Sequence, residues 1–260
     1  MPFFEKNNIR YFQFQDFSGA VTHAVFTRRG GVSPAPWSSL NVGGNVGDAP
    51  ANLRENRIRA FTALGRDPES VFDLWQVHGT RAVFASEPRP PDSHEDQGDL
   101  IFTDNPKITL YMRFADCTPL LFADTHLGVV GIAHAGWQGT VSGVATAAIK
   151  AMCEHYGSRP ENIQAAIGPS IGVDHYEVGE EVIQQVCENF GEEAESLLPR
   201  FGERRHFDMW AANRLQLERA GVTQVESANI CTACHLEDWF SHRAEKGKTG
   251  RFAAIIALKG

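Results

Sequence analysis

The chain lacks the features that would place it in a membrane or on nucleic acid. No stretch of about 18 consecutive apolar residues occurs, and the N-terminus lacks the basic head and apolar run of a signal peptide. Its 24 Lys and Arg residues are outnumbered by 32 Asp and Glu residues, which gives a formal charge of −8. Because nucleic-acid binding without sequence specificity needs a basic surface, this balance excludes such a partner. We expect a cytoplasmic protein that binds neither membrane nor nucleic acid.

Cofactor motifs and a disulfide framework are missing as well. No GxGxxG or Walker sequence opens a helix, so nothing supports a dinucleotide or nucleoside triphosphate site. The five cysteines are an odd number and are scattered, which favours free thiols in a reducing compartment. A chain of 260 residues buries enough surface to fold without a metal, so any metal site indicates chemistry.

The remaining pattern is that of one packed domain over residues 1–260. Short apolar runs bounded by turn residues predict strands, and apolar residues at helical spacing predict helices. The predicted strands are 21–27, 40–44, 109–115, 119–123, 129–134, 163–167, 225–230 and 252–258. The predicted helices are 53–64, 141–157, 179–190 and 209–220. Their irregular alternation favours a mixed, layered α/β (α+β) fold over a Rossmann sheet or a barrel.

One cysteine and two histidines form a candidate metal site. A hairpin in which Asp124 faces Val129 places His134 near the open end of the strand pair. Cys117 is then a diagonal neighbour on the same face, roughly 7 Å away. His78 ends another apolar run and is the third candidate. A thiolate with two imidazoles suits Zn²⁺ and leaves a fourth position open, as in catalytic sites.

The residues alone leave alternatives to this zinc site open. His78 and His134 could be hydrogen-bonded core histidines and Cys117 an inert thiol. Cys117 could instead be a nucleophile that His134 activates, a role that excludes metal ligation. Asp116, beside Cys117, is expected either to orient an imidazole or to carry a proton for a metal-bound water.

Two other cysteines, Cys231 and Cys234, precede His235 in the CxxCH spacing of covalent haem attachment. The chain has no export signal, so we interpret this match as accidental. A zinc site at the pair would need two more ligands, and no neighbour in the sequence supplies them at a familiar spacing. We therefore expect ordinary thiols at the end of a strand.

Arginines and aromatic residues indicate how a substrate could be held. Arg28 and Arg243 lie beside polar, glycine-containing segments, where a guanidinium group is well shaped for phosphate. Trp75, Trp137 and Phe114 could stack on a planar base. The alternative is that the arginines are solvated surface residues and the aromatic rings pack in the core.

An ordered series of short motifs extends from about residue 20 to the C-terminus. The motifs are Phe26-Thr27-Arg28-Arg29-Gly30-Gly31-Val32-Ser33, Ser39-Leu40-Asn41, Asn56-Arg57, Gln76-Val77-His78-Gly79, Ala115-Asp116-Cys117-Thr118-Pro119, His134-Ala135-Gly136-Trp137, Ile167-Gly168-Pro169-Ser170-Ile171-Gly172 and Thr249-Gly250-Arg251. Together they resemble the YfiH-like laccase-domain family. The resemblance implies a single-domain, layered mixed β-sheet sandwich flanked by helices, and a zinc ion held by His78, Cys117 and His134.

The resemblance also implies an activity. It implies a zinc-dependent purine nucleoside phosphorylase acting on adenosine, inosine, guanosine and methylthioadenosine, with adenosine deaminase as a side activity. The expected partners are purine nucleosides and phosphate, and the expected state is a monomer or homodimer. The expected catalytic residues are His78, Cys117, His134 and Asp116, and the expected substrate-binding residues are Arg28 and Arg243 for phosphate and Asn41 and Gln76 for ribose or base.

Two features of this chain qualify the resemblance. No two of its ten histidines stand two positions apart, so the His-x-His pairs of multicopper oxidases are missing and we reject laccase chemistry as the main activity. Residues 241–244 contain one arginine, where many members of the family have two. A phosphate clamp would then be weaker, or would be completed by Lys246, Lys248 or Arg251.

Other functions remain as alternatives. A zinc hydrolase or amidase could act on a peptidoglycan precursor, because bacterial members of the family are linked to peptidoglycan precursor editing. A cysteine hydrolase could use Cys117 and His134. A non-catalytic zinc-binding module would have a closed metal site and no turnover.

Overall fold

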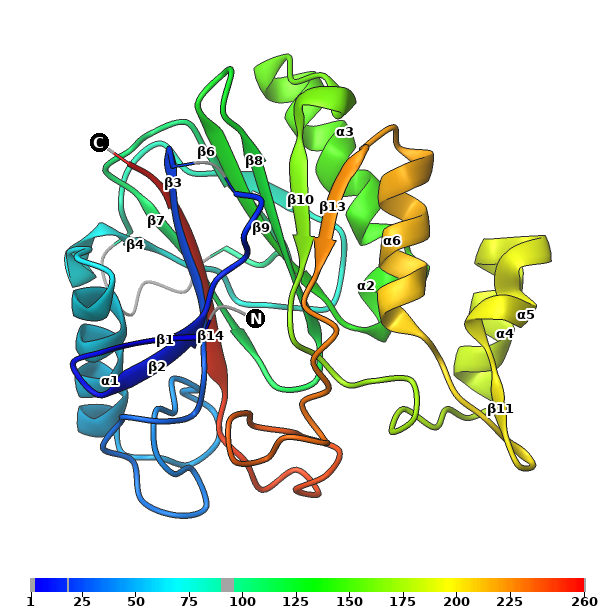
Figure 1. Ribbon diagram of the computed structural model, residues 1–260, viewed down its shortest axis with the longest axis horizontal. Coiled ribbons are helices and arrows are strands. Elements are labelled where there is room, and N and C mark those ends of the chain that lie inside the picture. The colour runs from blue at the N-terminus through cyan, green and yellow to red at the C-terminus, as the bar shows by residue number, and fades with distance from the viewer. Residues whose placement is uncertain (1–2, 18, 90–95, 260) are drawn as a thin grey trace.

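Two six-stranded sheets form the centre of the computed structural model, which describes residues 3–17, 19–89 and 96–259 (Figure 1). The first sheet has the order β1 (Phe3–Lys6), β2 (Ile9–Phe12), β3 (Val21–Phe26), β14 (Phe252–Leu258), β7 (Thr109–Phe114) and β4 (Val71–Phe72). The second has the order β13 (Gln224–Ser227), β10 (Gln164–Ile167), β8 (Thr118–Asp124), β9 (Val129–Ala135), β6 (Leu100–Thr103) and β5 (Ala82–Phe84). A short hairpin is formed by β11 (Arg200–Phe201) and β12 (Arg204–Arg205).

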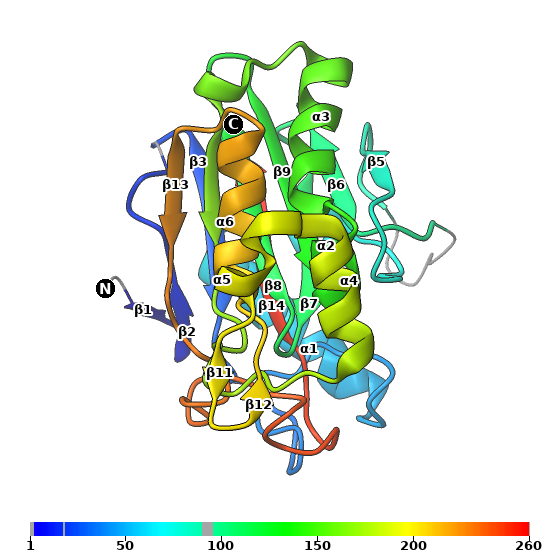
Figure 2. The same ribbon diagram turned by 90° about the vertical axis from the view of Figure 1, so that its right-hand side faces the viewer.

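Helices cover the outer faces of both sheets. They are α1 (Pro50–Ala63), α2 (Trp137–Val141), α3 (Val144–Tyr156), α4 (Glu180–Phe190), α5 (Ala194–Leu197) and α6 (Met209–Arg219), with short 3-10 helices at Pro68–Ser70, Pro160–Asn162 and Gly191–Glu193. Figure 2 shows α3 and α6 against the second sheet and α4 and α5 farther out. Helix α1 packs on the first sheet. This arrangement confirms the predicted layered, mixed β-sheet sandwich flanked by helices.

The main core lies between the two sheets. Met112 and Ile256 from the first sheet and Leu121 and Ile132 from the second are fully buried there. Every residue of β8, β9 and β14 is buried, because each of these strands has a sheet on one side and helices on the other. Strands covered on both faces are predominantly apolar.

The topology gathers several loops at one end of the second sheet. In the β8–β9 hairpin Asp124 pairs with Val129 and Pro119 with His134, which confirms the predicted register. Strand β10 runs antiparallel to β8 and parallel to β13. The ends of β10, β13 and β9 therefore meet the beginning of β8. The loops that follow β10 and β13 lie next to the Cys117 segment.

Some local predictions differ from the structure. The segment 40–44 is not a strand, because the buried side chain of Asn56 donates to the carbonyl oxygens of Ser39 and Asn41 and fixes an irregular path. Strands β1 and β2 were not predicted. The helix predicted at 141–157 is interrupted at Gly143, whose φ of +84° separates α2 from α3. Part of the predicted surface loop 86–98 lies outside the described residues.

Within the described residues, none of the helices combines the length and the apolar character needed to cross a bilayer.

Candidate metal centre

The three predicted metal ligands converge at the loop-rich end of the second sheet. Cys117 immediately precedes β8, His134 lies near the end of β9, and His78 lies in the loop that follows β4. One ligand atom from each lies within 4.8 Å of the others, and the two imidazole centroids are 4.8 Å apart. Zinc bonds of about 2.0–2.3 Å can be made from this arrangement after small side-chain adjustments. We call His78, Cys117 and His134 the first cluster.

The first cluster is open on one side only. His134 is buried, Cys117 is half-buried and His78 is exposed. A metal held by these three side chains would therefore face solvent past His78. Three protein ligands with one accessible position are typical of a catalytic metal site.

Asp99 holds the His78 loop and His134 in place through hydrogen bonds. Its side chain is fully buried and accepts hydrogen bonds from the backbone amides of Val77, His78 and Gly79 at 3.2, 3.0 and 2.7 Å. Its Oδ1 also lies 2.8 Å from Nδ1 of His134. Burial would raise the pKa of Asp99, but the His134 contact and these amides lower it overall. Because an ionised carboxylate only accepts hydrogen bonds, Nδ1 of His134 carries a proton and Nε2 is the nitrogen available to a metal.

Sequence reasoning missed Asp99. The residue stands directly before β6, and Leu100 pairs with Ala133 of β9. The pairing of β6 with β9 would have placed Asp99 opposite His134. That long-range pairing is the signal that could have found it.

Two residues of the centre hold left-handed backbone conformations. His78 has φ +61° and Asp116 has φ +78°. A residue other than glycine pays of order 1 kcal/mol or more for such a conformation, so the surroundings must impose it. Asp99 fixes the amide of His78, and the amide of Ile171 donates to the carbonyl of Asp116.

Gly136 leaves the space in which the first cluster assembles. A Cβ atom at this position would lie 2.6 Å from Nδ1 of His78 and 3.2 Å from Sγ of Cys117. A side chain at this position would force His78 to move. The glycine is therefore required by close approach to the first cluster.

The first cluster is a thiolate–imidazolium pair when no metal is bound. Burial would raise the pKa of the Cys117 thiol, but the positive charge and hydrogen bond of His134, with a hydrogen bond from His78, lower it to about 6. Burial would likewise lower the pKa of His134, but the Cys117 charge and Asp99 raise it to about 9. The thiolate is thus formed at neutral pH, which is the form that a metal or an electrophile needs.

The structure corrects one of the roles expected for Asp116. Its Oδ1 accepts from the Thr232 hydroxyl at 2.7 Å and its Oδ2 from the backbone amide of Arg243 at 2.6 Å. The carboxylate that orients an imidazole is Asp99 instead. Asp116 therefore ties two loops to the Cys117 segment.

The side chain of Arg28 contacts other parts of the protein. Its Nε donates to the carbonyl of Ser38, its Nη1 donates to the carbonyl of Leu236 and pairs with Glu245, and its guanidinium covers the ring of Phe240. These contacts join two loops. Since Nε and Nη1 bind protein acceptors, the predicted use of Arg28 as a phosphate clamp stays a prediction.

Asn41 cannot touch a substrate in this structure. The residue is 0% exposed. Its Nδ2 donates to Asp48 at 2.9 Å, and its Oδ1 accepts from the amides of Gly43 and Arg251 at 2.9 and 2.8 Å. The predicted contact with ribose or base is therefore wrong, and Asn41 instead holds the backbone of Arg251.

Gln76 anchors the loop that carries His78. Its Nε2 donates to the carbonyl of Arg113 and its Oε1 accepts from the amide of the same residue, at 2.9 and 3.0 Å. The side-chain amide thus pairs with β7 as a neighbouring strand would. Both polar ends of Gln76 are engaged in this anchoring role, and its contact with ribose or base stays a prediction.

Arg243, the other predicted phosphate ligand, lies beside the centre. Its guanidinium is exposed, lies 5.0 Å from the centroid of Tyr176, and donates from Nη1 to the carbonyl of Glu177 at 2.8 Å. Arg251 lies close enough to Cys117 and Asp116 for its charge to interact with theirs. Arg251 thus brings positive charge to the centre while its Nη1 donates to the carbonyls of Thr249 and Gly250, and Arg243 is joined to the centre by its backbone amide, which donates to Asp116.

The predicted aromatic platform is only partly present. Phe114 is 1% exposed and its ring centroid lies 5.5 Å from that of His134, so it belongs to the core beneath the centre. Trp137 packs partly buried against the cluster around α4. Trp75 and Val77, on the loop of His78, are 43% and 42% exposed. An apolar surface therefore borders the open side.

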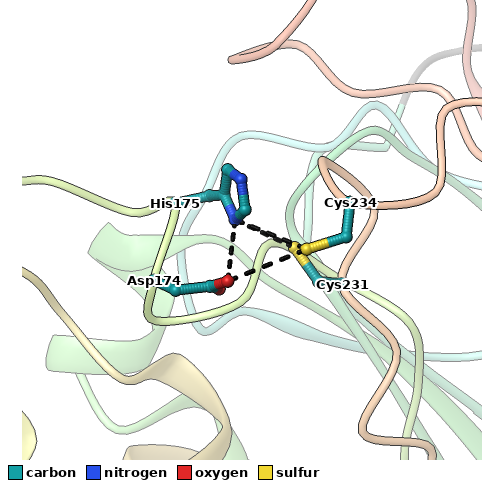
Figure 3. A group of neighbouring side chains, drawn as sticks. All are labelled: Asp174, His175, Cys231 and Cys234. Atoms are coloured by element: carbon teal, nitrogen blue, oxygen red, sulfur yellow. Dashed lines mark hydrogen bonds and ion pairs between the residues drawn. The ribbon is translucent and has the colours of Figure 1, made fainter.

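A second group of metal-binding side chains was not expected from the sequence. Asp174 and His175, in the loop after β10, meet Cys231 and Cys234, in the loop after β13 (Figure 3). We call these four residues the second cluster. No neighbour in the sequence supplies these further side chains; the parallel β10–β13 pair brings them from a distant segment.

Comparison with known proteins gives consistent matches over nearly the whole chain. Residues 22–259 match the family described as multi-copper polyphenol oxidoreductase laccase. A protein of Deinococcus radiodurans named purine nucleoside phosphorylase is 42% identical over 240 residues, which cover 92% of this chain and 90% of the relative. A protein of the same name from Bacteroides thetaiotaomicron is 31% identical, covering 98% of this chain and 97% of the relative.

A solved structure is also similar. The crystal structure of the hypothetical protein YfiH from Bacillus licheniformis superposes with a TM-score of 0.92 and 31% sequence identity, covering 99% of each chain. The two chains therefore share the layered sandwich from end to end.

Proposed function

The chain belongs to the family described as multi-copper polyphenol oxidoreductase laccase, and we propose that within it the protein is a zinc-dependent purine nucleoside phosphorylase. Membership of this family, with YfiH as a structural neighbour, confirms the resemblance seen in the motifs. Two relatives that match over nine-tenths of this chain or more carry the name purine nucleoside phosphorylase. The proposed substrates are adenosine, inosine, guanosine and methylthioadenosine, with phosphate.

The observation that carries the proposal is the first cluster with its positively charged border. His78, Cys117 and His134 offer one thiolate and two imidazoles, a donor set suited to zinc. Arg243 and Arg251 supply positive charge close by. A guanidinium group binds phosphate through parallel hydrogen bonds, so these arginines suit an anionic nucleophile.

Phosphorolysis requires an oxygen of phosphate to form a bond with C1′ of the ribose while the bond from C1′ to the purine nitrogen breaks. The electron pair of that bond leaves with the purine, which takes up a proton. In our proposal Arg243 and Arg251 hold the phosphate, and the exposed surface of Trp75 and Val77 lies against the base. We assign the proton to Asp116, whose carboxyl adjoins Cys117 and whose two oxygens each keep a second lone pair beside the hydrogen bonds from Thr232 and the Arg243 amide.

The proposed zinc ion contributes one kind of chemistry, and the protein's own residues position it. When bound, zinc supplies a Lewis acid that polarises an oxygen of the substrate. Asp99 keeps Nδ1 of His134 protonated and so presents Nε2 to the centre. The left-handed backbone of His78 and the space above Gly136 fix the positions of the His78 and Cys117 side chains.

The test is a nucleoside assay with and without phosphate. Purified protein with inosine and phosphate is expected to release hypoxanthine and ribose 1-phosphate in equal amounts. Base release at the same rate without phosphate would rule out phosphorolysis. Arg243→Ala is expected to raise the KM for phosphate more than the KM for inosine, while the matched variant Arg159→Ala, which lies before the start of β10 and pairs with Glu161, leaves both unchanged.

Adenosine deamination is proposed as a side activity of the same centre, because water reaches the first cluster along the exposed face of His78. Release of inosine and ammonia from adenosine without phosphate would support it. If Cys117→Ala loses both deamination and phosphorolysis, both reactions belong to one centre. If deamination survives in this variant, it takes place elsewhere in the protein.

A cysteine hydrolase is the competing function, and the lowered pKa of Cys117 favours it. The two functions differ in what the thiolate binds. A metal-free protein that remains active and is inactivated by thiol alkylation would support the hydrolase. Loss of activity on metal removal and its return with zinc would exclude it. We propose a cytoplasmic location for either enzyme, since the five cysteines are free.

A further inference from the structure

The second cluster brings four metal-binding side chains to one point, outside the centre proposed for catalysis. Its ligand atoms all lie within 4.8 Å of one another. Nδ1 of His175 is 3.8 Å from Sγ of Cys231, 3.5 Å from Sγ of Cys234 and 3.1 Å from Oδ2 of Asp174. Sγ of Cys234 is 3.8 Å from the same carboxylate oxygen. Figure 3 shows the ring and the carboxylate pointing at the two sulfur atoms.

These spacings match a tetrahedral ion. Bonds of about 2.0 Å to nitrogen or oxygen and about 2.3 Å to sulfur separate tetrahedral ligands by roughly 3.3–3.8 Å. The separations of 3.1 to 3.8 Å between ligand atoms of the second cluster fall close to that range. Thiolates, imidazole and carboxylate are all zinc ligands, and a closed set of four protein ligands is typical of a structural zinc site.

The backbone around the second cluster also favours the close approach of its ligand atoms. The amide of Gly172 donates to Sγ of Cys231 at 3.1 Å, a bond that stabilises a thiolate. A Cβ atom on Gly172 would lie 2.7 Å from Oδ1 of Asp174 and 3.2 Å from Sγ of Cys231. Only glycine permits this approach. The amide of His175 donates to the carbonyl of Gly172 and closes the turn.

The second cluster is accessible from solvent. Asp174, His175 and Cys234 are exposed and Cys231 is buried, so an ion could enter from solvent without opening the fold.

We propose that Asp174, His175, Cys231 and Cys234 bind a structural zinc ion, separate from the metal of the first cluster. The ion would fasten the loop after β10 to the loop after β13. Thr232, between the two cysteines, donates to Asp116. The zinc would therefore also steady Asp116 beside the centre, without contacting substrate. This proposal does not depend on the activity of the first cluster.

The experiment measures zinc in the full-length protein, purified with a thiol reductant and dialysed against zinc and then against buffer. Wild type is expected to retain about two zinc ions per chain and Cys117→Ala about one, because the second cluster keeps its own ion. Adding Cys234→Ser or His175→Ala to Cys117→Ala is expected to remove the remaining ion. His235→Ala is the matched control, since His235 is exposed, adjoins the second cluster in sequence and pairs with Glu237 instead.

A cobalt titration gives a second readout that does not need activity. Cobalt(II) added to metal-free Cys117→Ala is expected to give thiolate charge-transfer absorption and the strong visible bands of a tetrahedral site. Both should disappear with Cys234→Ser and persist with His235→Ala.

Three results would overturn the proposal. The first is equal metal content in Cys117→Ala and in Cys117→Ala with Cys234→Ser. The second is a Cys117→Ala protein that folds, as judged by circular dichroism, and binds neither ion. The third is a disulfide between Cys231 and Cys234 in the reduced preparation, detected by intact mass. An inactive wild-type protein that still holds the second ion would refute the phosphorylase and leave this site standing.

Discussion

The first and second clusters use similar side chains on different supports. The first stands at the ends of β8 and β9 over a buried carboxylate, Asp99, and presents three ligands to an open side. The second stands on two loops, is mostly exposed, and has four ligands. The comparison indicates a division of labour. A rigid support with an open position suits chemistry, and a closed set of four ligands suits the fastening of loops.

The largest expected contrast between the clusters is in catalysis. Cys117→Ala removes the thiolate of the first cluster and is expected to lower kcat/KM for inosine by about 1,000-fold, because a metal contributes several kcal/mol to the transition state. Cys234→Ser is expected to keep most of the activity. Steady-state kinetics with metal analysis measures both. The opposite pattern, with Cys234→Ser inactive and Cys117→Ala active, would break the assignment of roles.

The next contrast is between two thiols in metal-free protein. The pKa of Cys117 is about 6 and that of Cys234 about 12, so at neutral pH only the first is largely thiolate. We expect Cys117 to react with iodoacetamide about 100-fold faster, after allowing for the lower nucleophilicity of its less basic thiolate.

The pH dependence has a definite sign. As the pH falls through about 6, Cys117 gains a proton and its reaction should slow. Peptide mass spectrometry measures each cysteine separately. His134→Ala removes the charge that lowers the pKa of Cys117, so its reaction midpoint should move to higher pH; an unchanged midpoint would contradict the paired state.

A smaller effect is expected from the support of the first cluster. In Asp99→Asn the new NH₂ group would face Nδ1–H of His134 or force the ring to the other tautomer, in which Nε2 carries the proton. Zinc affinity of the first cluster should fall about 30-fold, within the range for residues that orient a ligand. The second cluster should be unaffected.

Competition with a chromophoric chelator measures the zinc affinity of Asp99→Asn. Asp73→Asn is the control, because Asp73 is also buried but pairs with Arg113 rather than with His134. Equal losses in the two variants would show that Asp99 acts on folding alone.

The smallest expected effect comes from the glycines beside the clusters. Gly172→Ala should weaken zinc at the second cluster about tenfold, because its Cβ would displace Asp174 or Cys231. Gly136→Ala should do the same at the first cluster through His78. Each variant should spare the other cluster. Zinc titrations that showed loss at both clusters would mean that the sites are one coupled unit.

The metal-binding trio could be predicted because most of its geometry is local. Cys117 and His134 lie on one hairpin, whose register follows from its short turn, and the structure has that register. The substrate residues Asn41 and Gln76 could not be judged in the same way. Their motifs are visible in the sequence, but burial and hydrogen bonding decide whether an amide meets a substrate or its own backbone, and both amides bind backbone.

The sequence by itself determined the layered fold and the hairpin that carries Cys117 and His134, because hydrophobic periodicity and turn chemistry act over a few residues; His78 was added to them by the family motif that contains it. The tertiary structure decided the remainder. Asp99 reaches His134 only through the pairing of β6 with β9, and Asp174 and His175 reach Cys231 and Cys234 only because β10 and β13 are parallel neighbours. Parallel strands are joined by long connections, so the side chains at their ends come from segments about 60 residues apart that no local pattern links.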